Sequence, residues 1–182
     1  MRSLHKISAP EAKCLSAVFT DIDGTLTDAH GRIPARVFTA LEAAQEAGLA
    51  VIPITGRPAG WCDLIARTWP VDGVVGENGG LYFRREDADH GGHTMLRAFA
   101  QNATERATNR ARLDELAVEV LSAVPGTALA SDQAYRVFDI AIDFCEDVPP
   151  LPDTEIDHLT ETLITGKKRV RDGDYTLLHE DL

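Results

Sequence analysis

The sequence has 182 residues, 44% of them hydrophobic, which suits one domain of ordinary size or one domain with an insertion. Its net charge of −11 argues against nonspecific binding to nucleic acid or to an anionic membrane surface, because either would repel most of this surface. No apolar run is long enough to cross a bilayer, and three widely spaced cysteines form neither a disulfide framework nor a zinc site, so we expect a cytoplasmic protein with reduced thiols.

The first half of the chain alternates between apolar strands and helices. Residues 15–22 predict a buried strand, 34–48 a helix that ends at a glycine, 49–56 a second strand, 59–69 a second helix and 71–79 a short third strand. Continuous apolar strands separated by helices are typical of a parallel sheet covered on both faces. The predicted fold class is therefore α/β, with a Rossmann-like parallel sheet as its core.

The second half has a different pattern. Residues 81–94 become polar and glycine-rich after Phe83, and a long helical stretch follows, with apolar residues at helical spacing from 113 to 124. Residues 135–144 alternate apolar and polar side chains, which predicts a half-buried antiparallel strand, and 153–164 predict a last helix. We expect these elements to form a separate α+β unit.

Two aspartates end the first predicted strand. Asp21 and Asp23 are two residues apart, so a strand that continues to its end places both side chains over one pocket, and Gly24 permits a sharp exit of the backbone. Two neighbouring carboxylates repel each other unless a cation lies beside them. Mg²⁺ suits this role because it takes oxygen ligands and also bridges to phosphate. One carboxylate can then attack phosphorus while the other gives and takes a proton.

The second predicted strand ends in groups that suit a phosphate. Thr55 can donate its hydroxyl to a phosphate oxygen, Gly56 lets backbone N–H groups approach, and Arg57 can offer its guanidinium. Each residue also has an ordinary explanation, since Asp-Gly is a common turn, Thr a common helix cap and Arg a common surface charge.

Three segments together resemble the haloacid dehalogenase-like phosphatases. DIDGTLTD at 21–28 is similar to their first motif, IPITGRP at 52–58 to their second, and GENGG at 76–80 to a segment of the large-cap subfamily IIB, which includes sugar-phosphate and mannosyl-3-phosphoglycerate phosphatases. For Glu77 and Asn78 within the third segment, an ordinary turn explains the residue types equally well.

The resemblance implies a Mg²⁺-dependent hydrolase of small phosphate monoesters of the sugar-phosphate type, with a small phosphorylated metabolite as its partner. It implies that Asp21 is the nucleophile that becomes an aspartyl-phosphate and that Asp23 protonates the leaving group and then activates water. It also implies that Mg²⁺ binds the carboxylate of Asp21 and the backbone carbonyl of Asp23, and that Thr55, followed by Gly56 and Arg57, holds the phosphoryl group.

The resemblance also divides the chain, into the N-terminal part of the core at 1–83, an inserted α+β cap at 84–166 and a tail at 167–182. The family has two further motifs after its cap, a lysine and an acidic pair, and neither Lys167 and Lys168 nor the acids at 172–181 match their spacing. We therefore expect a chain that lacks the last part of the core, so that its sheet is incomplete and an open strand edge favours self-association.

Two alternatives remain at this point. The chain could be an inactive remnant that keeps a phosphate- or metal-binding module without turnover. A phosphate-transfer receiver domain fits less well, because its phospho-acceptor would end a later strand, whereas Asp21 ends the first.

Overall fold

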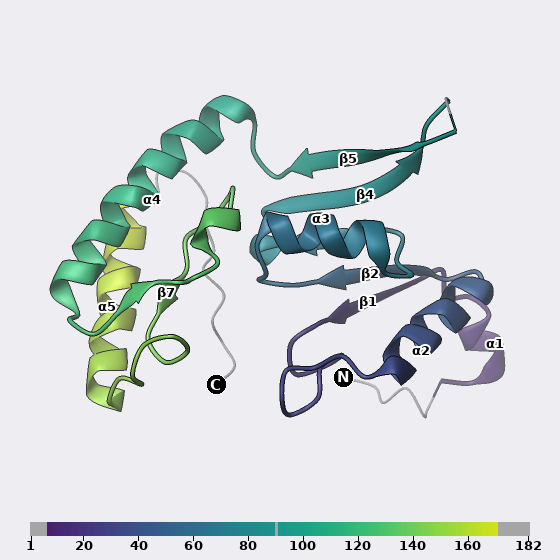
Figure 1. The fold of residues 1–182 in the computed structure, drawn as a ribbon, viewed down its shortest axis with the longest axis horizontal. Helices are drawn as coiled ribbons and strands as arrows, with labels where there is room; N and C mark the ends of the chain where they lie inside the picture. The colour runs from purple at the N-terminus through teal and green to yellow at the C-terminus, as the bar shows by residue number, and fades with distance from the viewer. Residues whose placement is uncertain (1–6, 90, 171–182) are drawn as a thin grey trace. The chain divides into compact units, whose positions relative to one another are not determined.

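The structure, a computed structural model, describes residues 7–89 and 91–170, and in it the chain forms two compact units (Figure 1). Unit 1 comprises the described residues up to Gly56 and those from Cys62 to Ala98. Unit 2 comprises Arg57–Trp61 and the described residues from Phe99 onward. The sequence places its expected boundary earlier, at residues 83 and 84, because the composition becomes polar there.

Unit 1 is built around a five-stranded sheet in the order β1-β2-β3-β4-β5. Its strands are β1 (Ala17–Asp21), β2 (Ala50–Ile54), β3 (Val74–Gly76), β4 (Leu81–Asp87) and β5 (His93–Phe99). Its helical segments are α1 (Ala9–Ala12), α2 (Ala35–Glu46), α3 (Ala59–Thr68, whose first three residues group with unit 2) and the short 3₁₀ turn η2 (Glu77–Gly79).

The first three strands are parallel, and the helices between them cover one face of the sheet. The expectation that both faces are covered is wrong for the described residues, since Phe19 and Ile54 on the other face are exposed. Each strand lies next to the one before it, so right-handed crossovers carry α2 and α3 over the same side. Val51 and Val74 are fully buried on that side, and Leu41 of α2 and Ile65 of α3 are buried as well. The predicted α/β class with a Rossmann-like arrangement of parallel strands is thus confirmed.

The edge strand β1 is less covered than β2. Among the described strands β1 pairs only with β2, and the Phe19 side chain, on the face opposite the helices, is 62% exposed. An open edge of this kind is the feature from which the sequence predicts self-association, which stays a prediction.

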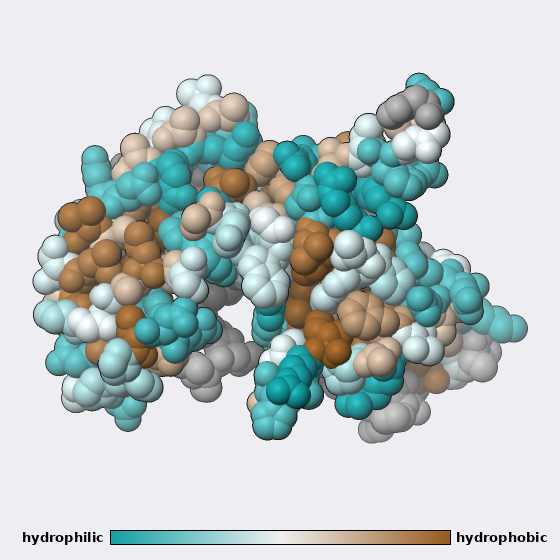
Figure 2. All heavy atoms as spheres, viewed as in Figure 1, coloured by the Kyte–Doolittle hydropathy of each residue, from teal (hydrophilic) through white to brown (hydrophobic). Residues whose placement is uncertain are grey.

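The polar segment after Phe83 is part of the sheet rather than a boundary loop. Strands β4 and β5 form a hairpin, and Figure 2 shows mostly hydrophilic residues over it. The hairpin is tied to α3 by Asp63, whose carboxylate accepts hydrogen bonds from Arg67 at 2.6 Å and from Arg97 of β5 at 2.9 Å. The sequence does not predict these two strands, because the residues after Phe83 carry little apolar signal.

Unit 2 packs two helices over a small strand pair. Its elements are α4 (Ala103–Ala123), β6 (Ala128–Leu129), the 3₁₀ turn η3 (Gln133–Tyr135), β7 (Ile142–Asp143) and α5 (Asp153–Val170). A capping box between Asn102 and Glu105 starts α4. The core of the unit consists of Leu116, Val120, Val124 and Leu159.

The strand expected over 135–144 is wrong except at its end, where Ile142–Asp143 pairs antiparallel with β6. The residues before it follow an irregular path around Arg136, whose guanidinium forms ion pairs with Asp132 at 3.1 Å and Asp139 at 2.8 Å. Gln133 accepts a hydrogen bond from the backbone N–H of Ala141 at 2.8 Å. Side chains thus satisfy backbone groups that a neighbouring strand would otherwise bind.

The end of the chain is described only in part. Residues 167–170 of the expected tail belong to the last turn of α5, and residues 171–182 lie outside the described residues. Within the described part of the chain, no helix is both long and apolar enough to span a membrane.

The two faces of α4 give a matched test of the core in unit 2. Val120 is fully buried, whereas Val118 on the same helix is 67% exposed. We expect Val120→Ala to lower the free energy of unfolding by about 2 kcal/mol, through lost burial and the cavity left behind. Val118→Ala should change it by less than about 0.5 kcal/mol. Urea denaturation followed by far-UV circular dichroism measures both, and equal effects would contradict the packing described.

Asp143 gives unit 2 a pH-dependent contribution to stability. Burial of this carboxyl opposes its ionisation, but hydrogen bonds from the backbone N–H groups of Glu146, Cys145 and Asp147 outweigh burial and lower its pKa below the ordinary 3.8. The ionised Asp143 carboxylate therefore makes its full contribution to the free energy of unfolding above pH 3.8, and this contribution is lost as pH falls through the lower pKa of the folded state. We expect Asp143→Asn to be less stable than wild type at pH 7, with a gap that narrows in acid. A gap that is constant in urea denaturation from neutral to acidic pH would refute this.

Candidate active site

The parallel register brings the ends of three strands to one edge of the sheet. Asp21 pairs with Ile54, and Ile54 pairs with Val75. The loops that follow β1, β2 and β3 therefore begin side by side. In a parallel α/β sheet this carboxyl edge is where ligands bind.

The loop after β1 presents two carboxylates on either side of a buried anchor. Ile22 is 1% exposed, whereas its neighbours Asp21 and Asp23 are exposed. The carbonyl oxygen of Ile22 accepts hydrogen bonds from the backbone N–H groups of Leu26 and Thr27 at 2.9 and 3.0 Å. The loop is thus closed on itself, with its apolar side chain in the core and its acidic side chains facing solvent.

Gly24 completes this loop in a left-handed conformation. Its φ is +71°, and its N–H donates to the hydroxyl of Thr27 at 2.8 Å. Residues with a Cβ rarely adopt such a φ, which explains the glycine after the second aspartate.

The loop after β2 is held by backbone hydrogen bonds to its neighbours. Thr55 is buried, and its N–H donates to the carbonyl of Val75 at 2.9 Å. Its own carbonyl accepts from the N–H of Asn78 at 3.3 Å. Gly56 follows, exposed, at the same edge as the two aspartates.

Arg57, the third residue predicted for phosphate binding, directly follows Gly56 and groups with unit 2. Its guanidinium lies over the indole of Trp61, 4.4 Å from the ring centroid. A cation over an aromatic face is attracted by the ring, so this side chain is held by a neighbour on α3.

Asp21 and Asp23 supply two exposed carboxylates at this edge, the kind of group that binds a divalent cation. Among the described residues, no cluster of three or more His, Cys, Asp and Glu side chains could hold a metal ion. A pair of exposed carboxylates fits Mg²⁺ nevertheless, because this ion takes one or two protein carboxylates and keeps several of its waters.

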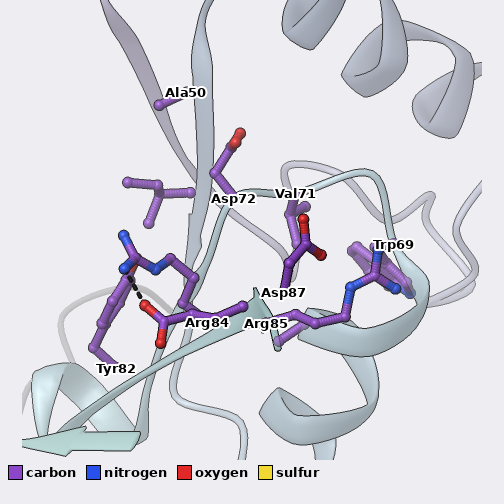
Figure 3. A pocket seen from close by; sticks show the side chains of 11 residues that line it. Ala50, Trp69, Val71, Asp72, Tyr82, Arg84, Arg85 and Asp87 are labelled. Carbon is purple, nitrogen blue, oxygen red and sulfur yellow. Dashed lines mark hydrogen bonds and ion pairs between the residues drawn. The ribbon is translucent and has the colours of Figure 1, made fainter. Parts of the chain in front are cut away.

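A groove of about 580 Å³ lies at the opposite edge of the sheet, beside the start of β2 and the end of β4 (Figure 3). Arg84 there is ion-paired with Glu86, Arg85 donates to a backbone carbonyl of α3 at 3.1 Å, and Asp72 accepts from the backbone N–H of Val51 at 2.8 Å. None of the predicted site residues lines this groove, and its charged groups are engaged with the protein itself.

The fold and the loops define an α/β protein with a carboxylate pair at the carboxyl edge of its parallel strands. Residues 18–115 match the family model of the haloacid dehalogenase-like hydrolases. This span is more than half of the chain, and the chain belongs to that family.

Individual relatives match over shorter stretches. The chain is 34% identical over 71 residues to a phosphoglycolate phosphatase of Methanoculleus marisnigri, a match that covers 38% of this chain and 30% of the relative. It is 40% identical over 70 residues to a phosphoglycolate phosphatase of Methanothermobacter thermautotrophicus, covering 37% and 31%. The chain thus spans about a third of the length of these curated relatives.

Among solved structures, a crystal structure from Thermoplasma acidophilum resembles the fold with a TM-score of 0.60 and 18% identity. The similarity covers 83% of this chain and 57% of that chain. At this level of identity it supports the fold.

The structure adds Glu77 and Asn78 to the residues at this edge. Both have positive φ, of 46° and 55°, and Asn78 contacts the loop after β2. The signal in the sequence is the pair of non-glycine residues between glycines after the third strand, in GENGG, but the residue types alone are equally typical of a surface turn.

The conformation of Gly24 gives a test of the first loop. No atom lies within 4 Å of the position that a Cβ would take there, so Gly24→Ala meets no steric clash and pays only for its positive φ. We expect it to cost about 1–2 kcal/mol, and Gly24→Asn less, because Asn tolerates this conformation. Thermal denaturation of the two variants measures the difference, and an alanine variant as stable as the wild type would rule out the left-handed turn.

Proposed function

We propose that this chain contributes the catalytic loops of a Mg²⁺-dependent phosphatase that hydrolyses small, soluble phosphate monoesters through an aspartyl-phosphate. The observation that carries the proposal is the placement of Asp21 at the end of β1, where it pairs with Ile54, the residue before Thr55, with Asp23 in the loop that follows, in a chain of the haloacid dehalogenase-like hydrolase family.

In the first step, a carboxylate oxygen of Asp21 attacks phosphorus, and the bond between phosphorus and the ester oxygen breaks. The leaving oxygen takes a proton from Asp23, which has to be protonated at the start. Thr55 donates its hydroxyl to a phosphoryl oxygen during the transfer, with Gly56 leaving room for the phosphoryl group and Arg57 supplying positive charge nearby.

In the second step, Asp23 accepts a proton from water, and the water oxygen attacks phosphorus. The bond between phosphorus and the Asp21 oxygen breaks, which releases inorganic phosphate and restores both carboxyl groups. Bound Mg²⁺, held by the Asp21 carboxylate and the Asp23 backbone carbonyl, would neutralise charge on the phosphoryl oxygens. Because Asp21 is a nucleophile, its negative charge has to be screened before a phosphate dianion approaches.

The names of the relatives and the charge of the chain support a substrate class. The curated relatives are named for phosphoglycolate, a small phosphorylated acid. A surface with a net charge of −11 disfavours large polyanions such as nucleic acids, so we propose a small phosphorylated metabolite as the substrate. Turnover of a panel of sugar phosphates and 2-phosphoglycolate, measured side by side, shows which of these two kinds of ester the protein prefers.

Removing the nucleophile tests the mechanism. With p-nitrophenyl phosphate and Mg²⁺, we expect Asp21→Asn to lower kcat by about 10³-fold or more, because the amide cannot form the acyl phosphate. Chelation of Mg²⁺ should also abolish turnover, and its return should restore it. The control is Asp89→Asn, which removes an exposed carboxylate from the turn between β4 and β5 and should leave kcat unchanged.

Two results would contradict the proposal. Turnover that survives in Asp21→Asn would exclude the aspartyl-phosphate. Wild-type protein that binds Mg²⁺ and inorganic phosphate but releases no product from any ester of the panel would favour a binding module without turnover.

A further inference from the structure

The turn after β3 has a backbone conformation that residues with a side chain avoid. Glu77 and Asn78 have φ of 46° and 55°, and Gly79 follows with φ of 94°. Each non-glycine residue in the left-handed region costs about 1–2 kcal/mol, less for Asn. Glycine precedes and follows the pair, yet the two strained positions themselves hold residues that have side chains.

Glu77 is anchored inside unit 1. Its side chain is 1% exposed, among the largest fully buried side chains of the chain. The N–H of Gly80 donates to its carbonyl at 3.0 Å, which closes the turn. A buried anchor of this kind fixes the direction in which the next residue leaves the sheet.

Asn78 lies against the loop that carries Thr55. Its N–H donates to the carbonyl of Thr55 at 3.3 Å. Its Oδ1 atom is 3.0 Å from the position that a Cβ would occupy on Gly56, which is closer than almost all ordinary contacts of a Cβ. The carboxamide of Asn78 thus occupies the space beside Gly56, and glycine at 56 is what permits this approach.

We propose that Asn78 is a positioning residue for phosphoryl transfer, which holds the Thr55–Gly56 peptide in the orientation that binds a phosphoryl group. The strain of its left-handed backbone is maintained because Glu77 is buried, and strain of this kind gathers at functional sites. The role of Asn78 is to limit movement of the loop, so that the Thr55 hydroxyl and the N–H groups after it point to one place. This inference rests on the proposed function for the phosphate itself, but its structural part stands alone.

Three variants separate positioning from folding and from charge. Asn78→Gly removes the carboxamide and relieves the backbone strain, so it should be at least as stable as wild type to heat. Asn78→Asp keeps the left-handed conformation and an oxygen beside Gly56 but adds negative charge next to the phosphate. Asp89→Gly, in the hairpin turn at the opposite edge of the sheet, is the control for the added freedom of a glycine.

The experiment uses the full chain and two measurements. The first is the NMR order parameter of the Gly56 amide without ligand, which we expect to fall in Asn78→Gly and to stay at the wild-type value in Asn78→Asp and Asp89→Gly. The second is the affinity for inorganic phosphate with Mg²⁺, which we expect to fall about tenfold or more in Asn78→Gly and Asn78→Asp and to be unchanged in Asp89→Gly.

The outcomes are distinguishable. A Gly56 amide that is as ordered in Asn78→Gly as in wild type overturns the positioning role, whatever the phosphate data show. An amide that loosens while phosphate affinity stays the same also overturns it, because the loop would then move without consequence for binding. Wild-type protein that binds no phosphate overturns the proposed function instead, and the order parameter alone then decides whether Asn78 holds the loop.

Discussion

The parallel hydrogen bonding of β1, β2 and β3 is the constraint on which the rest of unit 1 depends. It fixes Asp21 beside Ile54 and Ile54 beside Val75 through backbone groups alone. The polar loops that follow these strands have no continuous strand-to-strand hydrogen bonding of their own, so a slip in the register would move them apart. Because the strands are held by the buried apolar face under α2 and α3, the burial of Val51 and Val74 determines where the carboxylates lie.

Two of the loops at this edge join an exposed polar group to a buried anchor. Ile22 is buried between two exposed aspartates, and buried Glu77 precedes exposed Asn78. In both loops the backbone turns through a positive φ, at Gly24 in the first and at Glu77 and Asn78 in the second. Polar side chains at this edge can thus face solvent while their backbone is fixed, since the residue next to each is part of the core.

The sequence predicts the strands and helices of unit 1 because their apolar periodicity is strong, and it predicts the loops through Asp21 and Thr55 because their motifs are specific. It misses the β4–β5 hairpin, where polar residues lie on a strand held by its neighbours. It also misses the path around Arg136, where pairing with Asp132 and Asp139 replaces strand pairing and local alternation misleads. The burial of Glu77 and the close approach of Asn78 to Gly56 depend on tertiary packing, which the residue types do not reveal.

The position of β1 has a consequence for how the molecule opens. Of the three parallel strands, β1 is the one at the edge of the sheet, with a partner on a single side among the described strands, and Phe19 on its uncovered face is largely exposed. Local unfolding starts where few apolar contacts and few shared hydrogen bonds must be broken. We therefore expect the amides of the strand that carries Asp21 to exchange with solvent more readily than those of β2 and β3. Any ligand that bridges the loops after β1 and β2 closes that opening, so that occupancy of the site and protection of the sheet edge rise together.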